Sequence, residues 1–122
     1  MSLDFFRLSQ EQDREQSVRV VELELPEALD SGEFDRLNDA LLRVFAEEPD
    51  GRWVVDLSRL SYIGSSVLGL LVNVRQRVKD AGGGLALCGM SPRLLRIFQT
   101  CCLEKLFVIR PDRAAAARAI RI

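Results

Sequence analysis

The sequence predicts an α/β fold in which a mixed, mostly parallel sheet of about 4–5 strands packs against about 4 helices. In the second half of the chain, short apolar runs alternate with segments of helical periodicity, an order that favours parallel strands joined by right-handed crossovers. The period changes between residues 53 and 71, where a continuous apolar run gives way to apolar residues spaced three and four apart. No linker or repeat interrupts residues 1–122, so we expect one domain, with its core at 18–110 and a C-terminal helix at 111–122.

Two strands are predicted before the first helix. Residues 3–8 are rich in apolar side chains and favour a strand, and the polar residues 10–16 favour a turn. Residues 18–25 alternate between apolar and polar side chains, which is typical of a half-buried strand. Pro26 ends this strand because it has no N–H group to donate to a neighbouring strand.

A first helix is predicted over residues 32–47, because its apolar residues recur on one face. Asp30 or Ser31 can cap its N-terminus, since either side chain can accept a hydrogen bond from a free N–H group. Residues 48–51 include a proline and a glycine, which stop the helix and turn the chain. The apolar face comprises Phe34, Leu37, Leu41, Leu42, Val44 and Phe45.

The central segment predicts a buried strand followed by a second helix. Residues 53–57 form a short apolar run rich in β-branched side chains, and residues 66–80 have helical periodicity. Ser65 and Ser66 lie where this helix begins, and serine is a preferred N-cap. Two hydroxyl groups are therefore offered at the positive end of a helix dipole. The apolar stripe comprises Val67, Leu68, Leu71, Val74 and Val78.

The rest of the chain predicts two more strands and two more helices. Residues 81–84 end the second helix with a run of glycines, and residues 85–88 form the next strand. Residues 91–92, a serine and a proline, begin a third helix. A last strand is predicted at 106–109, and the short helix at 111–122 must pack on the body of the protein to be stable.

Charge and hydropathy restrict the possible partners. A formal net charge of −1 disfavours nucleic-acid binding, because neutralising phosphates requires a basic surface. No apolar run approaches the roughly 20 residues of a membrane span, and the N-terminal residues lack the pattern of a signal peptide. We therefore expect a cytoplasmic protein without direct membrane insertion.

The residues that usually perform catalysis are scarce. Cys88, Cys101 and Cys102 are predicted to be buried reduced thiols, because their odd number and irregular spacing suit no disulfide framework, with a redox role as the alternative. The chain has no histidine, and it shows neither a metal-ligand cluster nor a nucleophile paired with a base. We expect a binding protein rather than an enzyme, without cofactor or metal.

An ordered set of motifs occurs at residues 54–58, 62–69, 81–83, 91–93 and 103–107. The set resembles the STAS domain of bacterial anti-sigma factor antagonists, which implies a single STAS-type domain. Members of that family are small cytoplasmic switch proteins that bind an anti-sigma factor, often a serine protein kinase of the GHKL type. Phosphorylation of a serine at the start of a helix breaks the complex, and a phosphatase restores it. The oligomeric state expected is a monomer or weak dimer.

By position, the serine that is phosphorylated in the family corresponds to Ser65. The family aspartate before it is replaced by Gly64, and the family glycine two residues after it is replaced by Val67. The resemblance places the partner-binding surface on this loop, on the loop before the first helix and on the exposed side of the second helix. Its candidate residues are Asp30, Gly64, Ser65, Ser66, Val67, Asn73 and Arg77, with Arg75 and Gln76 also on that helix.

Plainer roles and a second function stay open. Ser65 and Ser66 can be mere helix caps, Gly64 a tight-turn residue, and Tyr62 and Trp53 core or semi-core aromatics. Because a carboxylate is absent at Gly64, the alternative function is a STAS scaffold that is not phosphorylated, or a subunit of a membrane or lipid-transport complex.

Overall fold

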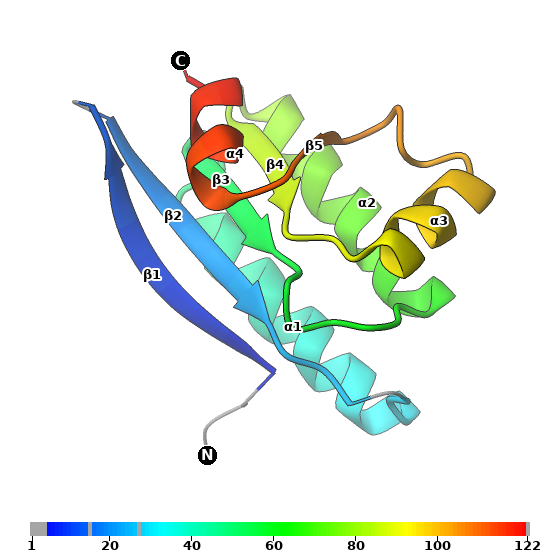
Figure 1. Cartoon of the computed structure of the whole chain (residues 1–122). Helices are drawn as coiled ribbons and strands as arrows, with labels where there is room; N and C mark the ends of the chain where they lie inside the picture. Colours follow the sequence, from blue (N-terminus) through cyan, green and yellow to red (C-terminus); the bar gives the residue numbers. More distant parts are fainter. Residues whose placement is uncertain (1–4, 15, 27, 122) are drawn as a thin grey trace.

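The computed structural model describes residues 5–14, 16–26 and 28–121. One five-stranded sheet with the strand order β1-β2-β3-β4-β5 is packed with four helices (Figure 1). β1 and β2 are antiparallel, whereas β2 to β5 are parallel neighbours, which confirms the predicted fold class. The elements are β1 (Phe6–Asp13), β2 (Gln16–Leu23), α1 (Ser31–Glu47), β3 (Arg52–Asp56), α2 (Ser65–Asp80), β4 (Gly84–Cys88), α3 (Pro92–Thr100), β5 (Val108–Arg110) and α4 (Arg113–Ala119).

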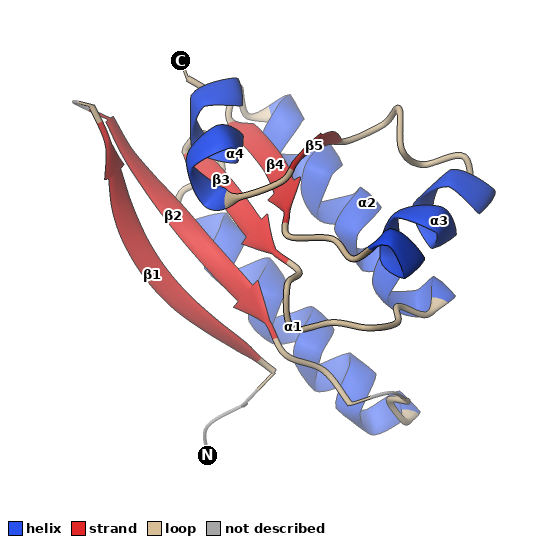
Figure 2. Ribbon diagram, in the orientation of Figure 1, coloured by secondary structure: helices blue, strands red, loops and turns tan. Residues whose placement is uncertain are grey.

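The first two strands form a longer hairpin than the sequence predicts. The turn predicted at 10–16 is wrong, because most of those residues pair across the hairpin as far as Asp13 with Gln16. β1 is the outer strand of the sheet, so its polar side chains face solvent while its backbone bonds to β2 (Figure 2). The second strand also ends two residues earlier than predicted, at Leu23. Residues 3 and 4 of the first predicted strand lie outside the described part of the chain.

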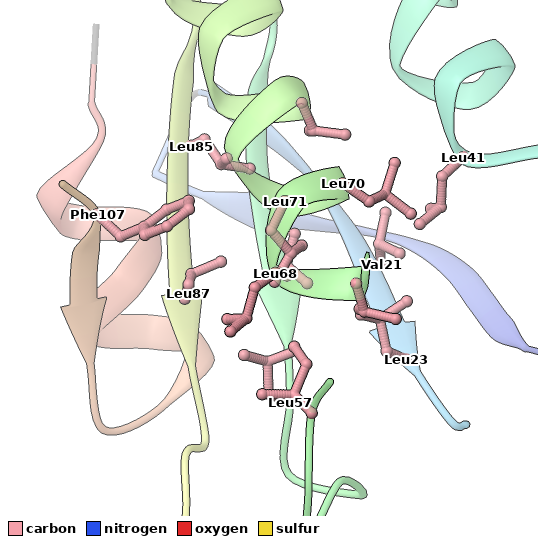
Figure 3. Packing of buried hydrophobic residues seen from close by; sticks show 14 of the residues in the cluster. Val21, Leu23, Leu41, Leu57, Leu68, Leu70, Leu71, Leu85, Leu87 and Phe107 are labelled. Atoms are coloured by element: carbon pink, nitrogen blue, oxygen red, sulfur yellow. The ribbon is translucent and has the colours of Figure 1, made fainter. Parts of the chain in front are cut away.

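The sheet separates two apolar clusters. In β2, Val21 and Leu23 face α1, α2 and α3, whereas Val18 and Val20 face α4. This alternation follows from the two-residue period of a strand. Figure 3 shows the larger cluster, in which leucines of α2 lie near Leu85 and Leu87 of β4 and near Leu57, which follows β3. The residues of α2 buried there are Val67, Leu68, Leu70, Leu71, Val74 and Val78.

The end of α2 depends on two of the predicted glycines. Gly82 has a φ of +83°, a backbone conformation in which glycine lacks the steric penalty of other residues. A Cβ atom on Gly83 would lie 2.5 Å from the carbonyl oxygen of Pro49 and 2.6 Å from that of Gly51. The glycine run therefore ends the helix and lets two backbone segments approach, which confirms the predicted helix stop.

A buried arginine joins the hairpin to the C-terminal helix. Arg52 is 5% exposed, and its guanidinium donates to the carboxylate of Asp13 at 2.9 Å and to the backbone carbonyls of Ala117 and Ile120. Arg121 donates to the same carboxylate, also at 2.9 Å. The predicted packing of the last helix against the body of the protein thus depends on polar as well as apolar contacts.

Acid is expected to weaken this junction. Hydrogen bonds from Arg121 and then from Arg52 lower the pKa of Asp13 from 3.8 to about 2. Because the folded protein binds this proton more weakly than the unfolded chain does, the stabilisation is present above pH 3.8 and is lost as the pH falls toward 2. We expect the free energy of unfolding, measured by urea at pH 4, 3 and 2, to fall less steeply with pH in Asp13→Asn than in the wild type. Parallel pH curves for the two proteins would contradict this role of Asp13.

The three cysteines differ in exposure. Cys88 in β4 is buried as predicted, and burial raises the pKa of its thiol to about 12, so the thiol stays neutral. Cys101 and Cys102 are exposed, so their predicted burial is wrong. They follow the last residue of α3, and a φ of +59° at Cys102 turns the chain there, away from the helix's buried face.

Candidate partner-binding site

One edge of the sheet gathers the starts of three helices. β2, β3 and β4 run parallel, so the loops that leave their carboxyl ends lie at the same edge, and these loops lead into α1, α2 and α3 (Figure 1). Asp30, Gly64 and Ser91 are the residues that precede the three helices. In open α/β sheets this carboxyl edge is where ligands usually bind.

The start of α2 differs from the predicted capped serine. The N-cap is Gly64, which offers no side-chain cap, and Ser65 and Ser66 are the first two helical residues. Both serines are exposed, and within the described part of the chain neither hydroxyl takes part in a hydrogen bond. The predicted capping role of Ser65 and Ser66 is therefore wrong, and both hydroxyls are free to react or to bind.

Gly64 is not required by the geometry of the loop. Its φ of −88° is accessible to any residue, and a Cβ atom there would meet only the Tyr62 ring, at 3.9 Å. The tight-turn role predicted for Gly64 is thus wrong. A Cβ atom therefore fits this position in ordinary van der Waals contact.

The first groove lies between the starts of α1 and α2 and has a volume of about 520 Å³. We call it the acidic groove because Asp30 and Asp35 line it, together with Phe34, Ser65 and Ser66. Asp30 also confirms its predicted cap: its carboxylate accepts from the Glu33 N–H at 2.8 Å, and the Glu33 side chain accepts from the Asp30 N–H at 3.1 Å.

The second groove lies between the starts of α2 and α3 and has a volume of about 410 Å³. We call it the basic groove because Arg93 and Arg96 line it and no carboxylate does. Its other lining residues are Tyr62, Ile63, Ser65, Leu68, Ile97, Thr100 and Cys101. Tyr62, Ile63 and Ser65 line both grooves. The exposed Tyr62 and Ser65 form the ridge between the grooves, and the buried Ile63 lies beneath it.

Tyr62 is 46% exposed, so the prediction that it is a core or semi-core aromatic is wrong. The next residue, Ile63, is 3% exposed and packs in the core, which turns the tyrosine side chain outward. The guanidinium carbon of Arg93 lies 5.7 Å from the centroid of the tyrosine ring. Trp53, by contrast, is fully buried as predicted.

The remaining candidate residues do not all reach the ridge. Val67 is 5% exposed and packs in the core, which confirms its place in the predicted apolar stripe, and it also lines the acidic groove. Asn73 and Arg77 are exposed and bond to each other at 3.2 Å, but they line neither groove. Arg75 donates to the Leu106 carbonyl at 2.6 Å and thereby fixes the segment before β5.

Sequence reasoning missed the residues that neighbouring helices bring to the ridge. Phe34 and Asp35 come from α1, and Arg93 and Arg96 come from α3. The available signal was the predicted parallel order of the strands, which places all three helix starts at one edge. The residue types alone gave no signal, since exposed charged residues are common on any helix.

Potential metal ligands and a carboxylate with a shifted pKa bear on what the described residues can do chemically. Across 5–14, 16–26 and 28–121, no group of three or more potential metal-ligating side chains comes together. Asp56 is buried at the end of β3. Burial alone would raise its pKa, but hydrogen bonds from the Ser58 N–H and from Arg113, at 2.7 Å, lower it. This carboxylate therefore belongs to a structural ion pair.

In the same part of the chain, no helix is long and apolar enough to cross a bilayer.

The sequence profile of the STAS domain matches residues 11–116. The chain belongs to the STAS-domain family. Its relatives include BtrV of Bordetella bronchiseptica, named as an anti-sigma factor antagonist, which is 30% identical over 83 residues that make up 68% of this chain and 72% of BtrV. The resemblance seen in the sequence motifs is thereby confirmed.

Solved structures agree with this STAS assignment. A Thermotoga maritima protein described as an anti-sigma factor antagonist has a TM-score of 0.76 at 21% identity, covering 98% of this chain and 97% of that chain. The phosphorylated form of the Bacillus protein SpoIIAA has a TM-score of 0.60 at 19% identity, covering 93% of this chain and 99% of that chain. The fold of this STAS domain is therefore the fold found in anti-sigma factor antagonists.

Proposed function

We propose that this STAS domain is an anti-sigma factor antagonist-like switch, which binds an anti-sigma factor or its kinase and is released by phosphorylation of Ser65. The observation that carries the proposal is the Ser65 hydroxyl, which is exposed, free of hydrogen bonds among the described residues and shared by two grooves of opposite charge. The name of BtrV supports the partner class, and the phosphorylated form of SpoIIAA supports a phosphate as the signal.

A phosphate on Ser65 would change the surface more than the fold. It adds roughly −1.5 to −2 charge at pH 7, and the N-terminus of a helix stabilises negative charge. Ser65 is the first residue of α2, so the folded domain should tolerate the modification. The same charge enters both grooves at once, which changes the surface that a partner must match.

The proposal also includes the enzymes that would modify Ser65. The kinase in this proposal is a serine protein kinase of the GHKL type that also acts as the anti-sigma factor, and a phosphatase resets the switch. Both would act in the cytoplasm, and the phosphorylatable hydroxyl would be presented by the ridge formed by Tyr62 and Ser65.

We expect the anti-sigma kinase to add one phosphate to Ser65. The wild type, Ser65→Ala and Ser66→Ala are incubated with the kinase and ATP, and intact mass is measured. Ser66 is the matched control, because it is equally exposed and adjacent but lines only the acidic groove. The mass shift should persist in Ser66→Ala and vanish in Ser65→Ala. A shift retained in Ser65→Ala would assign the modification to another residue.

Gly64→Asp should increase the rate of phosphorylation and slightly stabilise the domain. The position accepts a Cβ atom without strain, and an aspartate there can cap α2, which is worth a few tenths of a kcal/mol relative to glycine. The carboxylate also restores the residue that precedes the phosphorylated serine in the family motif. Initial rates with the same kinase and the thermal midpoint measure the two effects. An unchanged rate would show that this carboxylate has no part in recognition.

A constitutive binding module is the second candidate function. It is favoured by Gly64, where the geometry would accept a Cβ atom and the sequence has no carboxylate. Such a scaffold, or a subunit of a membrane or lipid-transport complex, would use the same ridge without modification. A stable complex with a partner that is not a kinase, together with no mass shift, would support this function over the switch.

A further inference from the structure

We propose that the basic groove binds an acidic segment of the protein partner, with an aliphatic side chain of that segment seated on the groove floor. This proposal depends on the proposed function in one respect: it assumes that the groove is occupied by part of a protein partner. It assigns a role to Arg93 and Arg96, which the phosphorylation switch does not itself require.

The arginines of the basic groove lack acidic partners. Within the described part of the chain, neither Arg93 nor Arg96 forms an ion pair, whereas Arg52, Arg113 and Arg121 each bind a carboxylate. No aspartate or glutamate lines the groove. Two exposed guanidinium groups without a carboxylate nearby favour a ligand that brings its own negative charge.

The groove also offers an apolar floor. Ile63 and Leu68 are 3% and 6% exposed, and the half-buried Ile97 of α3 completes the floor. At the rim, Arg93 lies over the ring of Tyr62, an arrangement that restricts where the guanidinium can point. A charged rim around an apolar floor matches an amphipathic peptide, in which acidic residues flank an aliphatic one.

Charge argues for a protein segment rather than a nucleic acid. The acidic groove, lined by Asp30 and Asp35, adjoins the basic groove at Ser65. Repulsion between phosphates and these carboxylates would oppose nucleic-acid binding, and the chain as a whole is slightly negative. A short acidic segment can occupy the basic groove without reaching the other.

The proposal also predicts the direction of the switch: phosphorylation of Ser65 should weaken binding of the partner. Ser65 lines the basic groove, so a phosphate there would stand beside Arg93 and Arg96 and repel an acidic occupant. The modified protein would then lose this contact by electrostatic competition, without any rearrangement of the fold.

The test uses the unmodified full chain and a library of random 12-residue peptides displayed on phage. The library is selected on the wild type, and each clone is then measured on Arg93→Gln/Arg96→Gln and on Arg43→Gln/Arg118→Gln. The second pair is the matched control, because it removes the same charge from exposed positions that line neither groove. No kinase is present, so a failure of Ser65 to be phosphorylated leaves the result intact.

We expect the selected clones to be rich in Asp or Glu beside Leu, Ile or Val, and to bind about tenfold more weakly to the groove variant than to the control variant. Raising the salt concentration should weaken the same clones. Clones that are neutral or basic, or that bind both double variants equally, would overturn the proposal, as would a failure to select any arginine-dependent clone.

Discussion

Replacing Ser65 by glutamate, or phosphorylating it, is expected to weaken the complex with the anti-sigma factor by about a hundredfold. A negative charge placed against like charge across an interface costs several kcal/mol, and every 1.4 kcal/mol is a tenfold change in affinity. The side chain lines both grooves, so a partner that occupied either groove in the proposed complex would lie close to it. Isothermal titration of wild type and Ser65→Glu against the anti-sigma factor measures the loss directly.

The control for this prediction is the next residue. Ser66→Glu adds the same charge one residue away, but Ser66 lines only the acidic groove, so its effect should be clearly smaller. In the Arg93→Gln/Arg96→Gln background, Ser65→Glu should have a reduced effect, because the acidic segment that the glutamate would repel is no longer held in the basic groove. Equal losses for Ser65→Glu and Ser66→Glu would show that the ridge is not the point of contact.

Arg52→Met is expected to lower the unfolding free energy by about 3 kcal/mol. Methionine keeps much of the side-chain volume, but it leaves the carbonyls of Ala117 and Ile120 without their donor and removes the salt bridge to Asp13. A domain of this size has only about 5–15 kcal/mol of stability in total, so the loss should be plain in urea unfolding.

Arg110→Met is the control for this second prediction. Arg110 is exposed at the end of β5, and its guanidinium bonds only to the adjacent Ile109 carbonyl, at 2.8 Å. Its replacement should change the unfolding free energy by less than about 0.5 kcal/mol. If Arg52→Met were no more costly than Arg110→Met, the buried guanidinium would not be what holds α4 and the hairpin to the sheet.

The strands and helices of the central layer could be predicted because their signals are local. The apolar run of β3 and the three-and-four spacing of α2 each identify an element without reference to the rest of the chain. The outer strand could not be identified in this way. Residues 10–13 are polar on both faces, because an edge strand exposed to solvent has no apolar period to detect.

The candidate site was only half predictable. Ser65 and Asp30 could be located because helix starts have local signals and the family motif marks the serine. The role of Arg93 depends on α3 packing beside α2, which is a tertiary relation that no local pattern contains. The burial of Arg52 could not be predicted from the sequence either, because a charged residue before an apolar run normally faces solvent.

The two grooves share Ser65 and carry opposite charge. A partner surface with one acidic and one basic part would be favoured in one orientation and repelled in the reverse one, which would set its acidic part against Asp30 and Asp35 and its basic part against Arg93 and Arg96. This edge of the domain is therefore negative on one side of Ser65 and positive on the other. A mutation that reversed the charge of one groove would therefore disturb the alignment of the complex before it abolished its formation.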